Sequence, residues 1–208
     1  AESAPGVPPP DAPPTGAAAF RSGFVALVGR PNVGKSTLLN AYVGEKVAIV
    51  SSRPQTTRRR VLGIRTTASE QAVFVDTPGI HVPRTRLDRI MVETARRAVP
   101  DADVVVWVVD VSRPPGDEDR AIAGLLRQAG RAVVVAMNKS DHLRPEHVAE
   151  NTEAYAALAG TDEWMLTVAT DGHNLDRLWA LVVARLPEGP AYFPPDQLTD
   201  QTDRMMVA

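Results

Sequence analysis

Six short runs rich in valine and other apolar residues recur along the chain from residue 24 onward. In 104–109 and 132–137 the apolar residues are continuous and do not alternate with polar ones. Continuous apolar runs indicate strands that are covered on both faces, which is typical of mostly parallel sheets flanked by helices. Strands are expected at 24–28, 61–66, 72–76, 103–110, 132–138 and 164–168.

Amphipathic stretches between these runs complete the pattern. Only residues 67–71 separate the second and third strands, too few for a crossover helix, so this pair is expected to form an antiparallel hairpin at the sheet edge. The predicted fold class is α/β, with a six-stranded, mostly parallel sheet and helices on both faces. Helices are expected at 35–43, 86–98, 118–129, 146–158 and 175–186.

Composition excludes several classes of function. The 208 residues include no cysteine, which rules out disulfides, thiol catalysis and cysteine-ligated metal sites. The formal net charge of -2 gives no chain-wide basic field for nucleic acid or an anionic membrane. None of the apolar runs approaches the roughly 20 residues of a bilayer-spanning helix, so a soluble protein is expected.

The two ends of the chain differ in composition from its centre. Residues 1–20 contain six prolines and no lysine or arginine, which predicts a disordered tail and not a secretion signal. Residues 188–208 contain more prolines and a polar stretch in which Thr199 or Asp200 can cap a new helix. The folded domain is therefore expected at 21–187, followed by a linker and the start of a truncated module.

A phosphate-binding sequence follows the first predicted strand. Residues 29–37 match the P-loop pattern G-x-x-x-x-G-K-[ST], whose glycines let backbone amides and a helix N-terminus face phosphates. Lys35 is predicted to bind the β- and γ-phosphates, and the Ser36 hydroxyl to bind Mg²⁺. The predicted nucleotide-binding residues of this loop are Gly29, Asn32, Val33, Gly34, Lys35, Ser36 and Thr37.

Two further motifs follow later strands. Asp76 and Gly79 form D-x-x-G, where the aspartate can hold a Mg²⁺-bound water and the glycine amide can meet the γ-phosphate. Asn138, Lys139 and Asp141 form N-K-x-D after the fifth strand. Within it, Asn138 is expected to tie this loop to the P-loop, and Lys139 to lie along the base.

The N-K-x-D motif predicts which base is bound. The Asp141 carboxylate can accept hydrogen bonds from both N1–H and the 2-amino group of guanine. Adenine has a lone pair at N1 and no 2-amino group, so it leaves that carboxylate unpaired. Guanine is therefore expected to be preferred by several kcal/mol.

Together these motifs resemble the translation-factor-like branch of P-loop GTPases and, more closely, the Era GTPase family. The closer resemblance rests on Arg-Pro-Asn in the P-loop, Pro-Gln-Thr-Thr-Arg at 54–58, Ile80 and His81 after the D-x-x-G motif, and the tail from 187 to Asp196. It implies a Ras-like sheet and a cytoplasmic role in assembly of the small ribosomal subunit, with 16S rRNA as a partner. It also implies peripheral contact with the cell membrane, and a monomer is expected.

The chain departs from the family pattern in two places. Era proteins continue into a KH-type RNA-binding domain, and its GXXG loop is absent here, so rRNA binding is expected to need that missing domain. The family's fifth motif begins Ser-Ala, whereas this chain has Val168 and Ala169. The Ala169 amide is still expected to reach the guanine O6, without the supporting hydroxyl.

Residues 44–60 are expected to be the first switch, because they form a long segment without periodicity after the first helix. The resemblance implies that Thr57, in preference to Thr56, joins Mg²⁺ when the γ-phosphate is present. The arginines at 58–60 and Arg53 are open to three readings: solvated surface, contact with RNA phosphates, or an internal arginine finger. Solvated surface is the default.

Catalysis is expected to depend on a cation. Ile80 stands where Ras-type enzymes carry the glutamine that orients water, and isoleucine cannot do this. Asn32 is similar to the asparagine that ligates potassium in potassium-activated GTPases, so we expect K⁺ to be bound through Asn32 and to speed an otherwise slow hydrolysis. The predicted catalytic residues are Asn32, Lys35, Thr57 and Gly79, and the predicted Mg²⁺ ligands are Ser36, Thr57 and Asp76.

Three functions fit these motifs. The leading one is a guanine-nucleotide switch that hydrolyses GTP. A P-loop ATPase or kinase is a second, against which the N-K-x-D motif argues. A guanine-nucleotide-dependent binding module with negligible turnover is a third, motivated by Ile80 and Val168.

Overall fold

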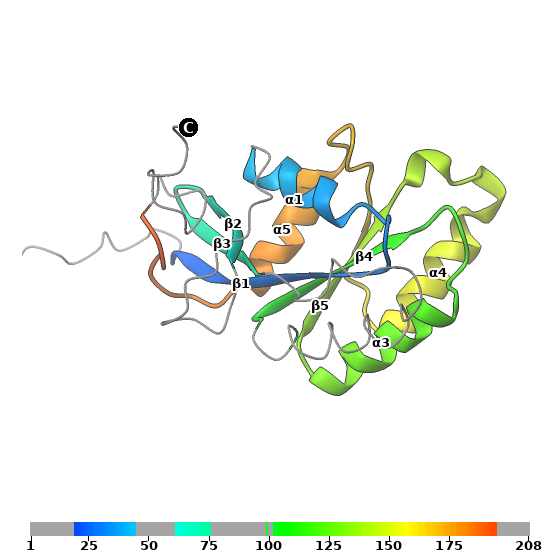
Figure 1. Cartoon of the computed structure of the whole chain (residues 1–208), viewed down its shortest axis with the longest axis horizontal. Coiled ribbons are helices and arrows are strands. Elements are labelled where there is room, and N and C mark those ends of the chain that lie inside the picture. Colours follow the sequence, from blue (N-terminus) through cyan, green and yellow to red (C-terminus); the bar gives the residue numbers. More distant parts are fainter. Residues whose placement is uncertain (1–18, 45–60, 76–98, 100–101, 195–208) are drawn as a thin grey trace, which may run out of the picture.

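The strands form one sheet in the order β2-β3-β1-β4-β5-β6 (Figure 1). The computed structural model describes residues 19–44, 61–75, 99 and 102–194. β2 and β3 are antiparallel and the other neighbouring pairs are parallel, so the predicted six-stranded sheet and its edge hairpin are confirmed. The strands are β1 (Arg21–Val28), β2 (Val61–Thr66), β3 (Glu70–Val75), β4 (Val104–Asp110), β5 (Ala132–Asn138) and β6 (Trp164–Leu166).

Burial of both sheet faces explains the continuous apolar runs. Successive residues of β4 point to opposite faces, and all six of its apolar residues are at most 1% exposed. Val104, Val106 and Val108 pack in one core, whereas Val105, Trp107 and Val109 pack in the other. A strand between two cores has no solvent-facing side, and therefore no position that favours a polar residue.

In the part of the chain that the structure describes, two helices cover each face of the sheet (Figure 1). α1 (Lys35–Val43) and α5 (Leu175–Arg185) lie on one face, and α3 (Asp117–Ala129) and α4 (Val148–Ala159) lie on the other. α4 begins two residues later than predicted because Pro145–His147 form a separate 3-10 turn. The helix expected at 86–98 lies outside the described residues. No helix in the described part of the chain is long and apolar enough to cross a membrane.

The parallel strands bring the loops that follow them to one edge of the sheet. The carboxyl ends of β1, β4, β5 and β6 meet there, because these neighbouring strands run in the same direction. The P-loop follows β1, and the N-K-x-D motif begins at the last residue of β5. In open α/β sheets this edge is where ligands bind.

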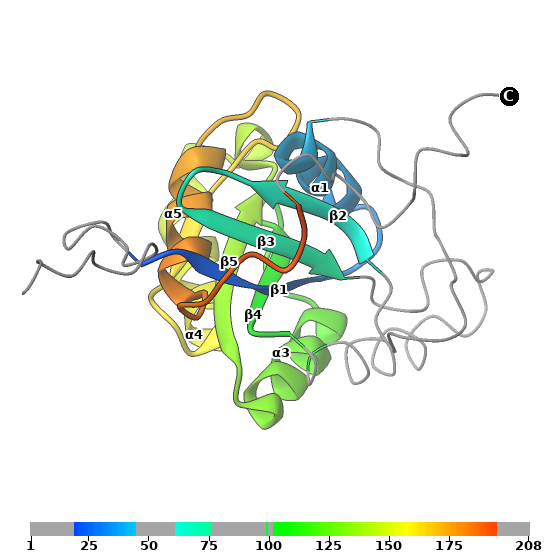
Figure 2. The same ribbon diagram turned by 90° about the vertical axis from the view of Figure 1, so that its left-hand side faces the viewer.

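Residues 187–194, which we call the C-terminal strap, return across β1 and β3 after α5 (Figure 2). The Ser22 amide donates to the Pro187 carbonyl at 3.0 Å. The fully buried Gln71 side chain accepts from the amides of Tyr192 and Phe193 at 2.8 and 3.0 Å and donates to the Phe193 carbonyl at 2.8 Å. One side chain of β3 therefore holds the backbone of the strap.

Replacing Gln71 with alanine is expected to lower the free energy of unfolding by about 1–3 kcal/mol, because it leaves polar groups of the strap without partners. Urea unfolding measures this change. Gln128→Ala is the matched control, since Gln128 is exposed on α3 and its replacement is expected to change stability by less than about 0.5 kcal/mol. Equal effects of the two substitutions would contradict the assigned role of Gln71.

Candidate functional site

The P-loop wraps around the N-terminus of α1. Gly34 is the N-cap residue in a left-handed conformation, with φ of 105°, and no side chain caps the helix. The first amides of α1 are therefore left to a ligand, and the helix dipole favours an anion there. Asn32 is also left-handed, with φ of 62°, which turns the loop back toward the helix.

Two glycines of the P-loop leave no room for a side chain. A Cβ on Gly29 would lie 2.1 Å from the carbonyl oxygen of Val108 in β4. A Cβ on Gly34 would lie 2.2 Å from Nδ2 of Asn138 at the end of β5. These glycines let the loop pack directly against the two neighbouring strand ends.

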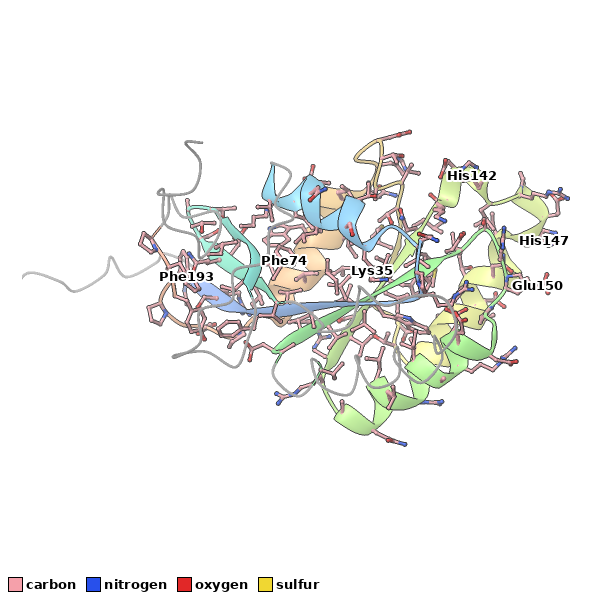
Figure 3. The ribbon with its side chains drawn as sticks, viewed as in Figure 1. Lys35, Phe74, His142, His147, Glu150 and Phe193 are labelled. Atoms are coloured by element: carbon pink, nitrogen blue, oxygen red, sulfur yellow. The ribbon has the colours of Figure 1, made fainter. Side chains whose placement is uncertain are left out.

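The Lys35 side chain folds back over the loop that precedes it (Figure 3). Its Nζ donates to the carbonyl oxygens of Gly29 and Arg30 at 2.7 and 2.6 Å. Burial lowers the pKa of Lys35 to about 8. The ammonium is thus partly desolvated beside the helix N-terminus, where the β- and γ-phosphates are expected.

Nucleotide affinity is expected to fall as the pH rises above about 8, the pKa of Lys35 before a nucleotide binds. Bound phosphates favour the charged amine and raise its pKa, so affinity is complete below the free pKa and declines by up to about tenfold per pH unit above it. Calorimetric titration with GDP between pH 7 and 9 measures the decline. Lys35→Arg is the control, because arginine stays charged throughout. If GDP affinity declines equally in both proteins, a group other than Lys35 causes the pH dependence.

Asn138 joins three loops of the site. Its Nδ2 donates to the Val33 carbonyl at 2.8 Å, the link to the P-loop that the motif predicts. Its Oδ1 accepts from the Ala169 amide at 2.9 Å and from the Thr167 hydroxyl at 3.4 Å. At position 168 the family pattern has serine, whereas this chain has Val168. The neighbouring residue, Thr167, supplies a hydroxyl instead. The Ala169 amide already has an acceptor, so guanine O6 would have to share it.

Asp110, the last residue of β4, holds Lys139. The Asp110 Oδ2 lies 2.8 Å from the Lys139 Nζ, and its Oδ1 accepts from the Ser112 hydroxyl at 2.6 Å. Burial would raise the pKa of Asp110, but the hydrogen bonds from Lys139 and Ser112 outweigh it and hold that pKa below its ordinary value. Asp110 belongs to none of the motifs found in the sequence, although its place at the end of a central strand was a usable signal.

Asp141 lines one cavity together with Lys35 and the start of α1. Its carboxyl group is 41% exposed, and Oδ2 lies 3.4 Å from Nε2 of His142. The cavity has a volume of about 550 Å³, within the range of small-molecule sites. It is lined by Pro31, Asn32, Gly34, Lys35, Ser36, Thr37, Asn138, Lys139, Asp141, His142, Val168, Ala169 and Thr170.

The remaining predicted site residues, Thr57, Asp76 and Gly79, lie outside the described residues. Ser36 presents an exposed hydroxyl in the cavity beside Lys35, and such a hard oxygen fits a Mg²⁺ ligand. The described segments contain no group of three or more histidine, aspartate or glutamate side chains that could bind a metal.

Comparison with known proteins gives a consistent result. The family model described as "50S ribosome-binding GTPase" matches residues 24–139. The "GTPase Era" of Heliobacterium modesticaldum is 43% identical over 189 residues, which cover 91% of this chain and 63% of that protein.

Two solved structures are similar in both sequence and fold. One is Era in complex with MgGDPNP and nucleotides 1506–1542 of 16S ribosomal RNA, with a TM-score of 0.72 and 37% identity. The other is a variant of Aquifex aeolicus Era bound to GDP.AlF4-, with a TM-score of 0.72 and 36% identity. Each match covers 88% of this chain and 63% of the solved chain, so the present chain spans less than two thirds of the relatives' length.

Proposed function

The chain belongs to the 50S ribosome-binding GTPase family, and from that premise we propose that it binds a guanine nucleotide with Mg²⁺ and hydrolyses GTP slowly, as an Era-like switch in assembly of the small ribosomal subunit. The observation that carries this proposal is the convergence of the P-loop and residues 138–141 on one cavity. The residues predicted to bind the phosphates and those predicted to bind guanine therefore line one space of nucleotide size.

Each end of the cavity has the chemistry that its part of the nucleotide needs. Lys35 and the first amides of α1 would bind the phosphates, and Ser36 would provide one ligand to Mg²⁺. Asp141 would accept two hydrogen bonds from guanine, while Asp110 keeps the Lys139 side chain in place beside the base. Thr57, Asp76 and Gly79 are proposed to complete this site around the γ-phosphate.

The proposed macromolecular partner is the 16S rRNA of the small subunit. Era with MgGDPNP and a 16S rRNA segment is a solved complex, and its fold is similar to that of this chain. Because the chain spans only 63% of that protein, RNA binding is proposed for the chain together with a KH-type domain. A cytoplasmic location, peripheral membrane contact and a monomeric state are proposed on the family resemblance alone.

Hydrolysis is proposed to depend on potassium bound through Asn32. Asn32 is exposed, lines the cavity and has a left-handed backbone. Because Ile80 stands in place of the orienting glutamine, turnover without a bound cation is expected near roughly 10⁻⁴ to 10⁻³ per second, as in unassisted Ras-like enzymes. A cation near the phosphates would neutralise the charge that develops during phosphoryl transfer.

The test is single-turnover GTP hydrolysis in potassium and in sodium buffer. For the native chain, we expect hydrolysis to be at least about tenfold faster in potassium than in sodium buffer. For Asn32→Ala, we expect the same rate in both salts. Gln128→Ala, on the exposed side of α3, is expected to retain the potassium effect. Equal rates in both salts would refute the role of potassium. If GTP stays bound and no phosphate is released over many hours, the chain is a guanine-nucleotide-dependent binding module and not a GTPase.

A further inference from the structure

A fully buried carboxylate lies behind the P-loop and belongs to none of the nucleotide motifs. Asp119, in the first turn of α3, is 0% exposed. Its Oδ1 accepts from Nε of Arg30 at 3.0 Å, and its Oδ2 accepts from the Gly116 amide at 2.9 Å. A buried charge of this kind is costly unless it is paired, so its partners are held strongly.

The partner Arg30 is part of the P-loop. Its guanidinium extends to α3, while its carbonyl oxygen accepts from Nζ of Lys35 at 2.6 Å. The Arg30 side chain is 24% exposed, against 1% for the side chain of Asp119, so the pair is largely shielded from water. The residue that carries one of the two acceptors for Lys35 is therefore anchored by its own side chain to a neighbouring helix.

Asp119 also lies near the base side of the site. The Tyr155 hydroxyl lies 3.5 Å from its Oδ2 and 3.3 Å from the carbonyl oxygen of Asp110. Asp110 in turn holds Lys139. A continuous set of polar contacts thus runs behind the cavity, from Arg30 through α3 and α4 to the N-K-x-D motif.

We propose that Asp119 is a positioning residue for phosphate binding, which acts through Arg30 to keep the first half of the P-loop in its binding conformation before a nucleotide arrives. This proposal rests on the proposed function, because it assumes that the P-loop binds the phosphates of a nucleotide. The loop is then fixed on three sides: Gly29 against β4, Arg30 on α3, and Val33 on Asn138. Of these three, the Arg30 contact is the one made by charged side chains.

A purely structural role for Asp119 predicts different behaviour. Asp119 accepts from the Gly116 amide at the N-terminus of α3, so its replacement can lower stability through that helix alone. Asp119→Asn keeps a side-chain oxygen for Gly116 and removes the charge that Arg30 needs. Arg30→Gln removes the same ion pair without touching the cap of α3, and Arg30→Lys restores a cation to the loop.

The experiment measures GDP and inosine diphosphate affinity by calorimetry at 10 °C, where circular dichroism verifies that each variant is folded. Asp119→Asn and Arg30→Gln are expected to weaken both nucleotides at least tenfold and to leave their affinity ratio within twofold of the native ratio, since that ratio reports the 2-amino contact at Asp141. Arg30→Lys is expected to recover most of the affinity. Asp117→Asn is the matched control, because Asp117 is a fully exposed acid in the same helical turn, and is expected to bind as the native chain does.

Amide hydrogen exchange of the ligand-free proteins provides a second readout that needs no nucleotide. Faster exchange in residues 30–37 of Asp119→Asn and Arg30→Gln, with β4 and β5 unchanged, is the expected result. A folded Asp119→Asn protein with native GDP affinity and native exchange in the P-loop would overturn the positioning role. If the native chain itself binds no GDP, the proposed function fails, and the exchange measurement still decides whether Asp119 orders the loop.

Discussion

Replacing Gly34 with alanine is expected to weaken GDP binding by at least about 100-fold and to lower the free energy of unfolding by about 2–4 kcal/mol. The new methyl carbon would lie 2.2 Å from Nδ2 of Asn138, at a residue with φ of +105°. Asn138 would have to move, and its contacts with Val33 and Ala169 would break. The substitution therefore separates the P-loop from the guanine-reading loop. Calorimetry with GDP and urea unfolding measure the two effects.

Gly44 is a matched control for Gly34, because it lies at the opposite end of α1 and also has a positive φ, of +83°. No described atom lies within 4 Å of a Cβ built on Gly44. Gly44→Ala is therefore expected to cost only the backbone strain, about 1 kcal/mol, and to leave nucleotide affinity within about threefold. Equal losses of affinity in the two variants would show that conformational freedom, and not the contact with Asn138, is what matters at Gly34.

The second large effect is expected at the guanine-reading carboxylate. Asp141→Asn replaces two acceptor oxygens with one acceptor and one donor, so the N1–H and 2-amino group of guanine can no longer both be satisfied. GDP affinity is expected to fall by at least about 100-fold, because the loss combines a charge-assisted pair with an unsatisfied group. Xanthosine diphosphate, which carries an oxygen in place of the 2-amino group, is expected to bind the variant better than GDP does.

Asp162→Asn is the control for Asp141, since Asp162 is an exposed acid that precedes β6 at the opposite edge of the sheet. Its replacement is expected to leave both affinities unchanged. A normal preference for GDP over xanthosine diphosphate in Asp141→Asn would remove Asp141 from its assigned role. Stability of both variants is expected to stay within about 0.5 kcal/mol, because the two positions lie outside the packed cores.

The central sheet could be predicted because its physical cause is local in the sequence. Strands with both faces buried must be apolar at every position, and β5 has the bounds that its apolar run predicts. The start of β1 was less accessible to prediction, since its first residues pair with Glu70 and Gln71 on a distant strand. β6 is shorter than predicted because Val168 leaves the strand and bonds locally with His173.

The candidate site divides in the same way. The P-loop and N-K-x-D residues could be predicted because their spacing along the chain follows from the backbone shape that binds phosphate and base. Asp119 and Gln71 could not be assigned roles, since their contacts join residues up to 122 positions apart. Each is a polar side chain whose role depends on which distant group folds against it. Long-range pairs of this kind become visible only in three dimensions.

The proposed function requires this chain to bind guanine nucleotides in the cavity lined by Lys35 and Asp141. Calorimetric titration of the native chain in Mg²⁺ buffer at pH 7, with GDP, GTP, ADP and ATP in turn, tests it most directly. We expect saturable binding of GDP and GTP with one site per chain, and no measurable binding of the adenine nucleotides at the same concentrations. No binding of GDP or GTP, or equal binding of the adenine nucleotides, would contradict it.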